Sequence, residues 1–175
     1  MSAIRWYSHT VKKGGENVKW QRRKRAKTVN NLVICDNKYN ILAISDCIDG
    51  NHHDNFEIVD NVKKMLESLD KQLIDYKMSH LNADSGFDVL AFIEFIEQQK
   101  IIANIKQNKR NSKKKMPEYR YMSDYIYAFR FKIEVVFAWM DSYKRLLVRF
   151  EQLAKNFKSW LFMASAMINF RHIFN

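Results

Sequence analysis

The stretch Leu81-Asn82-Ala83-Asp84-Ser85-Gly86-Phe87-Asp88 joins a short apolar run to a segment with helical periodicity. Residues 78–83 have the length of a strand, and apolar side chains recur at helical intervals between Val89 and Ile96. A carboxylate at such a strand end is typical of metal ligands and catalytic groups in α/β folds. Asp84 is therefore the first candidate site residue. The alternative is that Asp84 lies in a solvated turn and Asp88 caps the next helix.

A second candidate acid lies in a predicted helix over residues 126–141. At about 100° per residue, Glu134 falls on one narrow stripe with Tyr127, Arg130 and Asp141. The adjoining face is apolar, and a helix docked by it would hold Glu134 at the edge of the core. The alternative is an Arg130–Glu134 ion pair on a solvated edge, worth about 0.3–0.5 kcal/mol. The apolar face comprises Ile126, Phe129, Ile133, Val136, Phe137 and Met140.

Several motifs together carry a family resemblance. Besides residues 82–88 and the Tyr127-x2-Arg130-x3-Glu134 spacing, the chain has Arg145-Leu-Leu-Val-Arg149-Phe-Glu. With these, it resembles the DDE transposases of bacterial insertion sequences. The likeness runs from about Ser8 to Phe170. It includes Lys-Gly-Gly-Glu at 13–16, Gly-Asn-His-His-Asp at 50–54 and Asn-Lys-Arg-Asn at 108–111.

The resemblance implies an α/β fold, an RNase H-like mixed β-sheet flanked by α-helices, as a single domain over residues 1–175. In that family two Asp and one Glu hold two divalent metal ions, Mg²⁺ or Mn²⁺, that cut and rejoin DNA. By motif match, Asp84 would be the second acid and Glu134 the third, so both would be catalytic and metal-binding. Arg130 and nearby lysines would steady DNA phosphates, and Tyr127 would orient Glu134 or the DNA.

The first acid is where the chain departs from the family pattern. Family members carry Asp-Gly-Ser/Thr on the first strand, whereas here Trp6-Tyr7 precedes Ser8. Trp6 cannot ligate a hard cation, which wants several oxygen ligands, and two-metal catalysis needs a bridging carboxylate. We therefore expect either a transposase catalytic domain that is inactive alone or a non-catalytic DNA-binding remnant. A weaker alternative is a nuclease that takes its third carboxylate from Asp36, Asp46 or Asp49.

The net charge points to a nucleic acid partner. Lys and Arg outnumber Asp and Glu by 30 to 19, which gives a charge of +11 and an isoelectric point near 9.6. The apolar-rich segment at residues 160–166 is too short to span a bilayer. We therefore expect double-stranded DNA as partner, no membrane, and a cytoplasmic protein associated with the nucleoid when bound. The resemblance also allows a homodimer on DNA.

Two basic segments, residues 19–27 and 106–120, are candidates for phosphate contacts. The first contains Trp20, and the second would flank the acidic site. Cations that contact phosphates release condensed counterions, which favours binding. The alternative is that both segments are simply solvated. The candidate DNA-binding residues are Arg22, Arg23, Lys24, Arg25, Lys109, Arg110, Lys113, Lys114, Lys115, Tyr127 and Arg130.

The remaining elements follow from periodicity and turn residues. Strands are expected at 4–7, 29–35 and 41–48, with a hairpin turn at 36–40. A helix ending near Tyr76 should be capped by Asp54 and Glu57, an alternative to a zinc site at 49–54. A strand at 101–105 should lie parallel to that at 78–83, and a last helix should span 153–170. No helix-turn-helix precedes the domain, so we expect the DNA-recognition domain to be missing. An adjoining upstream frame that encodes a helix-turn-helix and Asp-Gly-Ser/Thr would show that the chain is one piece of a split or frameshifted transposase.

Overall fold

The centre of the fold is a mixed β-sheet. The structure is a computed structural model that describes residues 2–53, 55–108 and 120–174. Within these residues the sheet has eight strands in the main order β2-β3-β1-β6-β7, while β4 and β5 also pair with β3, and β8 pairs with β1. The strands are β1 (Ser2–Val11), β2 (Lys19–Gln21), β3 (Ala26–Asp36), β4 (Ile41–Ile44), β5 (Ile48–Asp49), β6 (His80–Ala83), β7 (Ile102–Ile105) and β8 (Val148–Arg149).

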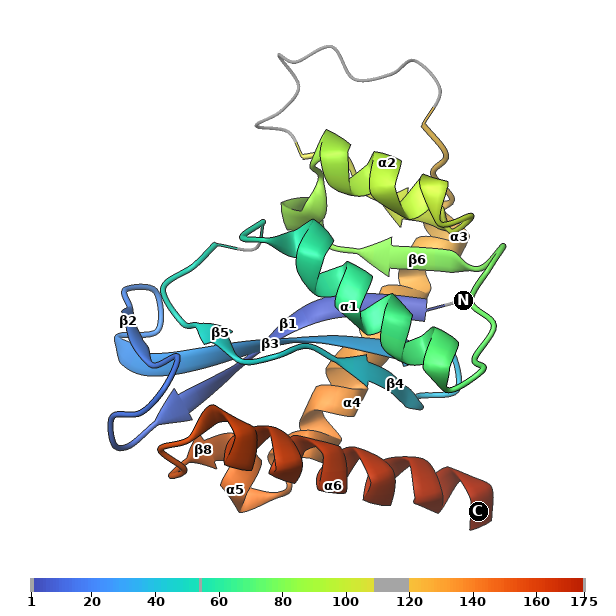
Figure 1. The fold of residues 1–175 in the computed structure, drawn as a ribbon. Coiled ribbons are helices and arrows are strands. Elements are labelled where there is room, and N and C mark those ends of the chain that lie inside the picture. The colour runs from blue at the N-terminus through green and yellow to red at the C-terminus, as the bar shows by residue number, and fades with distance from the viewer. Residues whose placement is uncertain (1, 54, 109–119, 175) are drawn as a thin grey trace.

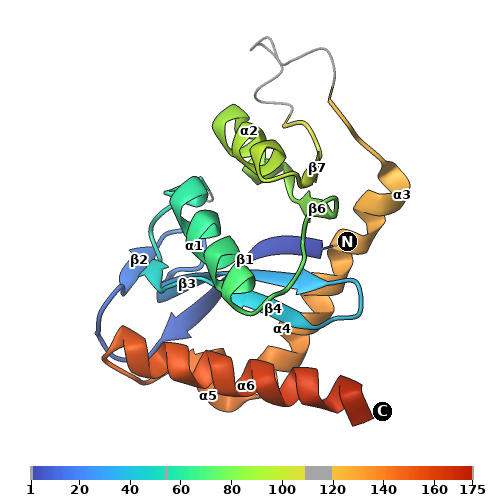
Figure 2. The same ribbon diagram turned by 45° about the vertical axis from the view of Figure 1, so that its right-hand side comes forward.

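Helices cover both faces of this sheet. Figures 1 and 2 show α1 on one side of the β1–β3 pair and α6 on the other. Two apolar clusters correspond to these layers. One is shared by α1, α2 and the sheet, and the other by α4, α6 and the opposite face. The helices are α1 (Ile58–Lys71), the 3-10 turn η1 (Ser85–Phe87), α2 (Leu90–Gln98), α3 (Asp124–Tyr127), the 3-10 turn η3 (Ala128–Phe131), α4 (Lys132–Asp141), α5 (Lys144–Leu147) and α6 (Ala154–Phe174).

The sheet agrees with the expected α/β, RNase H-like architecture. β1 and β3 are antiparallel, whereas β6 and β7 are parallel and α2 connects them, as predicted. The hairpin turn forms around Asp36, whose Oδ1 accepts hydrogen bonds from the backbone N–H groups of Lys38 and Asn40, both at 2.8 Å. The expected strand at 41–48 is interrupted, because the side chain of Ser45 accepts the backbone N–H of Leu32 at 2.8 Å.

The predicted capping arrangement is wrong. Glu57 is itself the N-cap residue of α1, in a left-handed conformation with φ of 45°, and its side chain makes no capping hydrogen bond. It therefore cannot be the reciprocal partner in the first turn of the helix. Asp54 lies outside the described residues.

Two motifs far apart in sequence meet at the end of β8. Arg149 is fully buried and donates hydrogen bonds to the carbonyl oxygens of Glu16 and Gln152, both at 3.0 Å. Gly15 also packs against this turn, since a Cβ at Gly15 would lie 2.7 Å from the carbonyl oxygen of Gln152. A guanidinium that satisfies carbonyl oxygens in this way fixes the strand end without a carboxylate partner.

A second close backbone contact, between Gly50 and Thr28, can be tested by substitution. A Cβ at Gly50 would lie 2.3 Å from the carbonyl oxygen of Thr28 in β3, whereas one at Gly14 would meet nothing within 4 Å. We expect Gly50→Ala to lower the free energy of unfolding by about 1–3 kcal/mol, as overpacking does. Gly14→Ala, the matched control, should stay within about 0.5 kcal/mol of the parent. Urea unfolding measures both, and equal midpoints for the two variants would contradict the close contact.

Candidate functional site

The candidate site lies along an open edge of β1. On this side β6 pairs with Ser2–Ile4 and β8 pairs with Thr10–Val11, so residues 5–9 lie between the two partner strands. A groove of about 610 Å³ follows this edge. Its walls come from β1, from the turn between β2 and β3, and from α4, with Phe87 of η1 and Leu147 of α5. Segments far apart in the chain therefore meet here.

Asp84 lies directly after β6 and is held by two arginines. Arg130 donates from Nη1 to Asp84 Oδ1 at 2.5 Å, and the Nε of Arg5 lies 3.4 Å from Oδ2. The guanidinium of Arg130 also lies over the ring of Tyr127, 5.0 Å from its centroid. Partial burial raises the pKa of the Tyr127 hydroxyl, and the nearby Asp84 acts in the same direction. Tyr127 thus contacts Arg130 and supports its position against Asp84.

Glu134 reaches the same place from α4. Ile133, Val136 and Met140 are buried and dock this helix on the sheet, as the apolar stripe predicted. The prediction of one helix over residues 126–141 is wrong, because the chain divides there into α3, η3 and α4, and Ile126, Phe129 and Phe137 are only partly buried. The carboxylate of Glu134 accepts a hydrogen bond from Nη1 of Arg5. Asp84 and Glu134 are 50 residues apart in sequence, yet they converge on one guanidinium. The Arg130–Glu134 pair considered from sequence gives way to two longer-range pairs, Arg130–Asp84 and Arg5–Glu134.

The expectation that Trp6 lies beside Asp84 in the place of the first acid is wrong. Ala3 pairs with Asn82 and Ile4 with Ala83 in the parallel ladder, so Arg5 is the residue that comes level with Asp84. Trp6 packs against the apolar cluster of α1 and α2, on the opposite face of the sheet, and it also lines the groove at the edge of β1. Successive side chains of a strand point to opposite faces, so one residue changes the face.

The other acids considered from sequence have partners elsewhere. Asp36 holds its hairpin turn, Asp46 pairs with Lys158 at 2.5 Å, and Asp49 accepts from Asn17 at 3.3 Å. Across residues 2–53, 55–108 and 120–174, no group of three or more His, Cys, Asp or Glu side chains could hold a metal ion. The zinc alternative at 49–54 also includes Asp54, which lies outside the described residues.

Asp88 has a role that the sequence did not indicate. It does not cap α2, whose N-cap residue is Val89. Its buried carboxylate accepts the backbone N–H of Asn108 at 2.6 Å and pairs with Nη1 of Arg120 at 2.6 Å. Arg120 also donates to the carbonyl oxygen of Ile105 at 2.5 Å. These partners lie 20 and 32 residues from Asp88, beyond the reach of any local pattern.

The first basic segment forms a hairpin turn beside the groove. Arg22–Arg25 connect β2 to β3, and Arg23 and Lys24 line the groove together with Arg5 and Glu134. Lys24 donates to the carbonyl oxygen of Ser8 at 3.0 Å. Partial burial lowers the pKa of Lys24, and the neighbouring charge of Arg23 adds to this. Arg22 and Arg25 are exposed in the same turn.

The second basic segment is described only in part. Lys109, Arg110, Lys113, Lys114 and Lys115 lie outside the described residues. The prediction that they bind DNA therefore stays a prediction.

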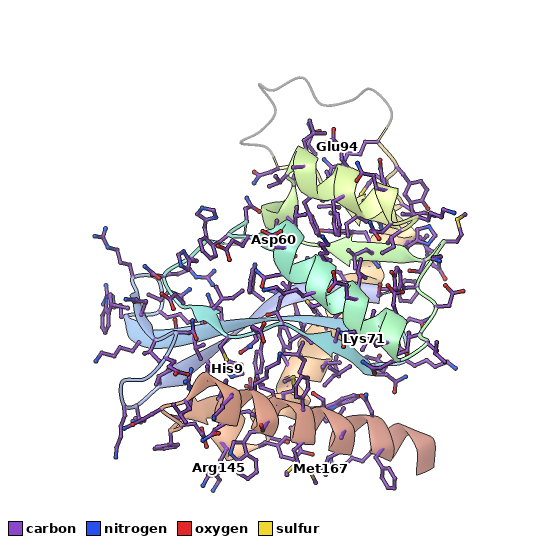
Figure 3. The ribbon with its side chains drawn as sticks, in the orientation of Figure 1. His9, Asp60, Lys71, Glu94, Arg145 and Met167 are labelled. Carbon is purple, nitrogen blue, oxygen red and sulfur yellow. The ribbon has the colours of Figure 1, made fainter. Side chains whose placement is uncertain are left out.

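A buried tyrosine lies beneath the groove and was missed from sequence. The hydroxyl of Tyr7 donates to Asp141 of α4. Burial raises the pKa of Tyr7, and the hydrogen bond and negative charge of Asp141 add to the effect. Tyr7 also contacts the ring of His9, which lies toward α6 (Figure 3), with ring centroids 4.1 Å apart. Tyr7 thus joins β1 to α4 next to Arg5.

Comparison with protein families decides the affiliation of the chain. The family model described as Transposase DDE domain matches residues 3–169. The chain belongs to the transposase DDE domain family. No curated protein and no solved structure matches it.

The family implies a DNA substrate and generally uses divalent metal ions. The residues of this transposase-family chain do not fit such ions as they stand. Both carboxylates that would ligate metal are already paired with guanidinium groups, and no third acid joins them among the described residues. Hard cations need several oxygen ligands.

The buried pair at Asp88 can be tested by substitution. Asp88→Asn keeps the shape of the side chain but leaves Arg120 without its counter-charge. Because breaking a buried pair is strongly destabilising, we expect a loss of about 3–5 kcal/mol in the free energy of unfolding. Asp46→Asn is the matched control, since the Asp46 side chain is 61% exposed beside Lys158; its loss should stay below about 1 kcal/mol. Similar losses in urea unfolding for both variants would contradict a structural role of Asp88.

Proposed function

We propose that this transposase-family chain binds duplex DNA along the open edge of β1, through phosphate contacts and without reading base sequence. The observation that carries the proposal is that Arg23 and Lys24 line one groove beside the acidic pair, whose two carboxylates already bind Arg5. Two neighbouring cations on an open groove suit a phosphate backbone. The DNA substrate implied by the family supports the same assignment.

The hairpin that carries Arg23 and Lys24 strengthens this proposal. Trp20 on β2 is 57% exposed, and Arg22 and Arg25 are exposed in the adjoining turn. Exposed cations next to an exposed aromatic ring can contact both phosphates and sugar or base surfaces. The overall charge of +11 would add a sequence-independent attraction to any duplex.

A second candidate function is DNA cleavage and strand transfer by a two-metal-ion mechanism, as in an insertion-sequence transposase. The convergence of Asp84 and Glu134 favours it. In this proposal Asp84 and Glu134 would be the catalytic, metal-binding acids for Mg²⁺ or Mn²⁺. It also requires a third acid in the place that Arg5 takes, so DNA binding without cleavage is the function that the geometry supports better.

The cellular setting belongs to the same proposal. No helix among the described residues is both long and apolar enough to cross a bilayer. We propose a cytoplasmic location, association with the nucleoid when DNA is bound, and a homodimer on DNA.

Salt dependence of DNA binding tests the groove. We expect the affinity for random-sequence duplex DNA to fall steeply with KCl concentration, because cations on phosphates release counterions. In the double variant Arg23→Ala/Lys24→Ala, the log-log salt slope should decrease in magnitude by about 1 for each cation that no longer binds a phosphate. Fluorescence anisotropy over a KCl series measures both quantities.

The matched control keeps the net charge of that variant. Lys63→Ala/Lys71→Ala removes two exposed cations from α1, and Figure 3 shows Lys71 on this helix, separated from α6 by the sheet. Its slope should equal that of the parent. Equal slopes in the groove variant and the control would mean that the groove binds no phosphate. A smaller slope in both would indicate diffuse attraction only.

A further inference from the structure

The charges around Asp84 and Glu134 balance without any metal ion. Two carboxylates meet two guanidinium groups, those of Arg5 and Arg130. Arg5 is central, because its Nε faces Asp84 while its Nη1 binds Glu134. A cation that touches both acids at once lies where an ion shared by them would have to lie.

The position of Arg5 is set by the strand ladder and not by a flexible approach from outside. Ala3 pairs with Asn82 in parallel register; two residues further along come Arg5 on β1 and Asp84, which follows β6 in an extended conformation. Both side chains therefore project from the same face. Glu134 lies over that face on α4, which is docked by buried Ile133 and Val136. The guanidinium is held by its own backbone at the site, so it competes with dissolved ions at a high effective concentration.

We propose that Arg5 is the resident cation of the Asp84–Glu134 pair and excludes divalent metal ions from it. A metal ion would have to displace Arg5 from two carboxylates and would also face the positive charge of Arg130 on Asp84. After that displacement, two carboxylates would still be a poor set for a hard cation. Arg5 is thus a specificity-determining residue. Because of it, the two acids bind a guanidinium group in place of a metal ion.

The proposal predicts that one substitution converts the site. Arg5→Asp removes the cation and adds a carboxylate level with Asp84 on the face that Glu134 covers. Mn²⁺ binding, followed by the electron paramagnetic resonance signal of the free ion without DNA, should be at least tenfold tighter in this variant than in the parent. Adding Asp84→Asn to Arg5→Asp should abolish the gain. Absence of DNA makes the measurement independent of the proposed DNA-binding function.

Trp6→Asp is the matched control. It adds a carboxylate one residue away, but on the face that packs against α1 and α2. This variant should bind Mn²⁺ no better than the parent. A gain for Trp6→Asp that equals the gain for Arg5→Asp would overturn the proposal, because the added acid would then act by general charge and not by position.

A second variant guards against misfolding of Arg5→Asp. Arg5→Met keeps an extended side chain but removes the charge, and it should bind Mn²⁺ more tightly than the parent and more weakly than folded Arg5→Asp. Circular dichroism establishes which variants are folded. Mn²⁺ binding by the parent that disappears in Asp84→Asn would overturn the proposal, as would parent-like binding by folded Arg5→Met.

Discussion

Parallel pairing of β1 with β6 determines the position of the charged groups at the candidate site. The ladder joins Ala3 to Asn82 and Ile4 to Ala83, and it thereby sets Arg5 level with Asp84. A shift of one residue would turn Arg5 toward α1 and Trp6 toward α4, since side chains alternate between the faces of a sheet. Such a shift would also turn the buried side chain of Ile4 away from the cluster of α1 and α2 and toward that of α4 and α6. Burial of the apolar core therefore determines that Arg5 is the cation that lies between the two acids.

The opposite wall of the site depends on the docking of α4. Buried Ile133, Val136 and Met140 hold this helix on the sheet, so Glu134 cannot move independently of the core. Tyr7 on β1 donates to Asp141 near the end of the same helix, which adds a polar link between the two elements. The local Arg130–Glu134 spacing is a helical neighbour pair, yet Arg130 binds Asp84 just after β6 and Glu134 binds Arg5 on β1. Tertiary packing here outweighs the local ion pair, which is worth only about 0.3–0.5 kcal/mol.

Local sequence patterns predicted which helices and strands form better than they predicted where these elements begin and end. Apolar periodicity indicated α1, α2 and α6, and the strand-helix-strand order indicated the parallel β6–β7 pair. The prediction for Glu57 failed because the chain enters α1 through a left-handed residue, which no side-chain spacing reveals. The strand at 41–48 is broken for a similar reason. The hydroxyl of Ser45 accepts the backbone N–H of Leu32 in place of a main-chain carbonyl oxygen, and Leu32 lies in β3.

The amino-acid sequence by itself determined the strongly basic character, the family motifs, and Asp84 and Glu134 as the acids to examine. These are properties of composition and of short spacings, which need no knowledge of distant contacts. Only the tertiary structure decided that Arg5 joins the acids, that Trp6 lies on the other face, and that Asp88 holds Asn108 and Arg120. The physical reason is that strand register and buried charge pairing arise from residues far apart in the chain. Which strand register and which charge pairs form depends on which apolar faces can be buried together.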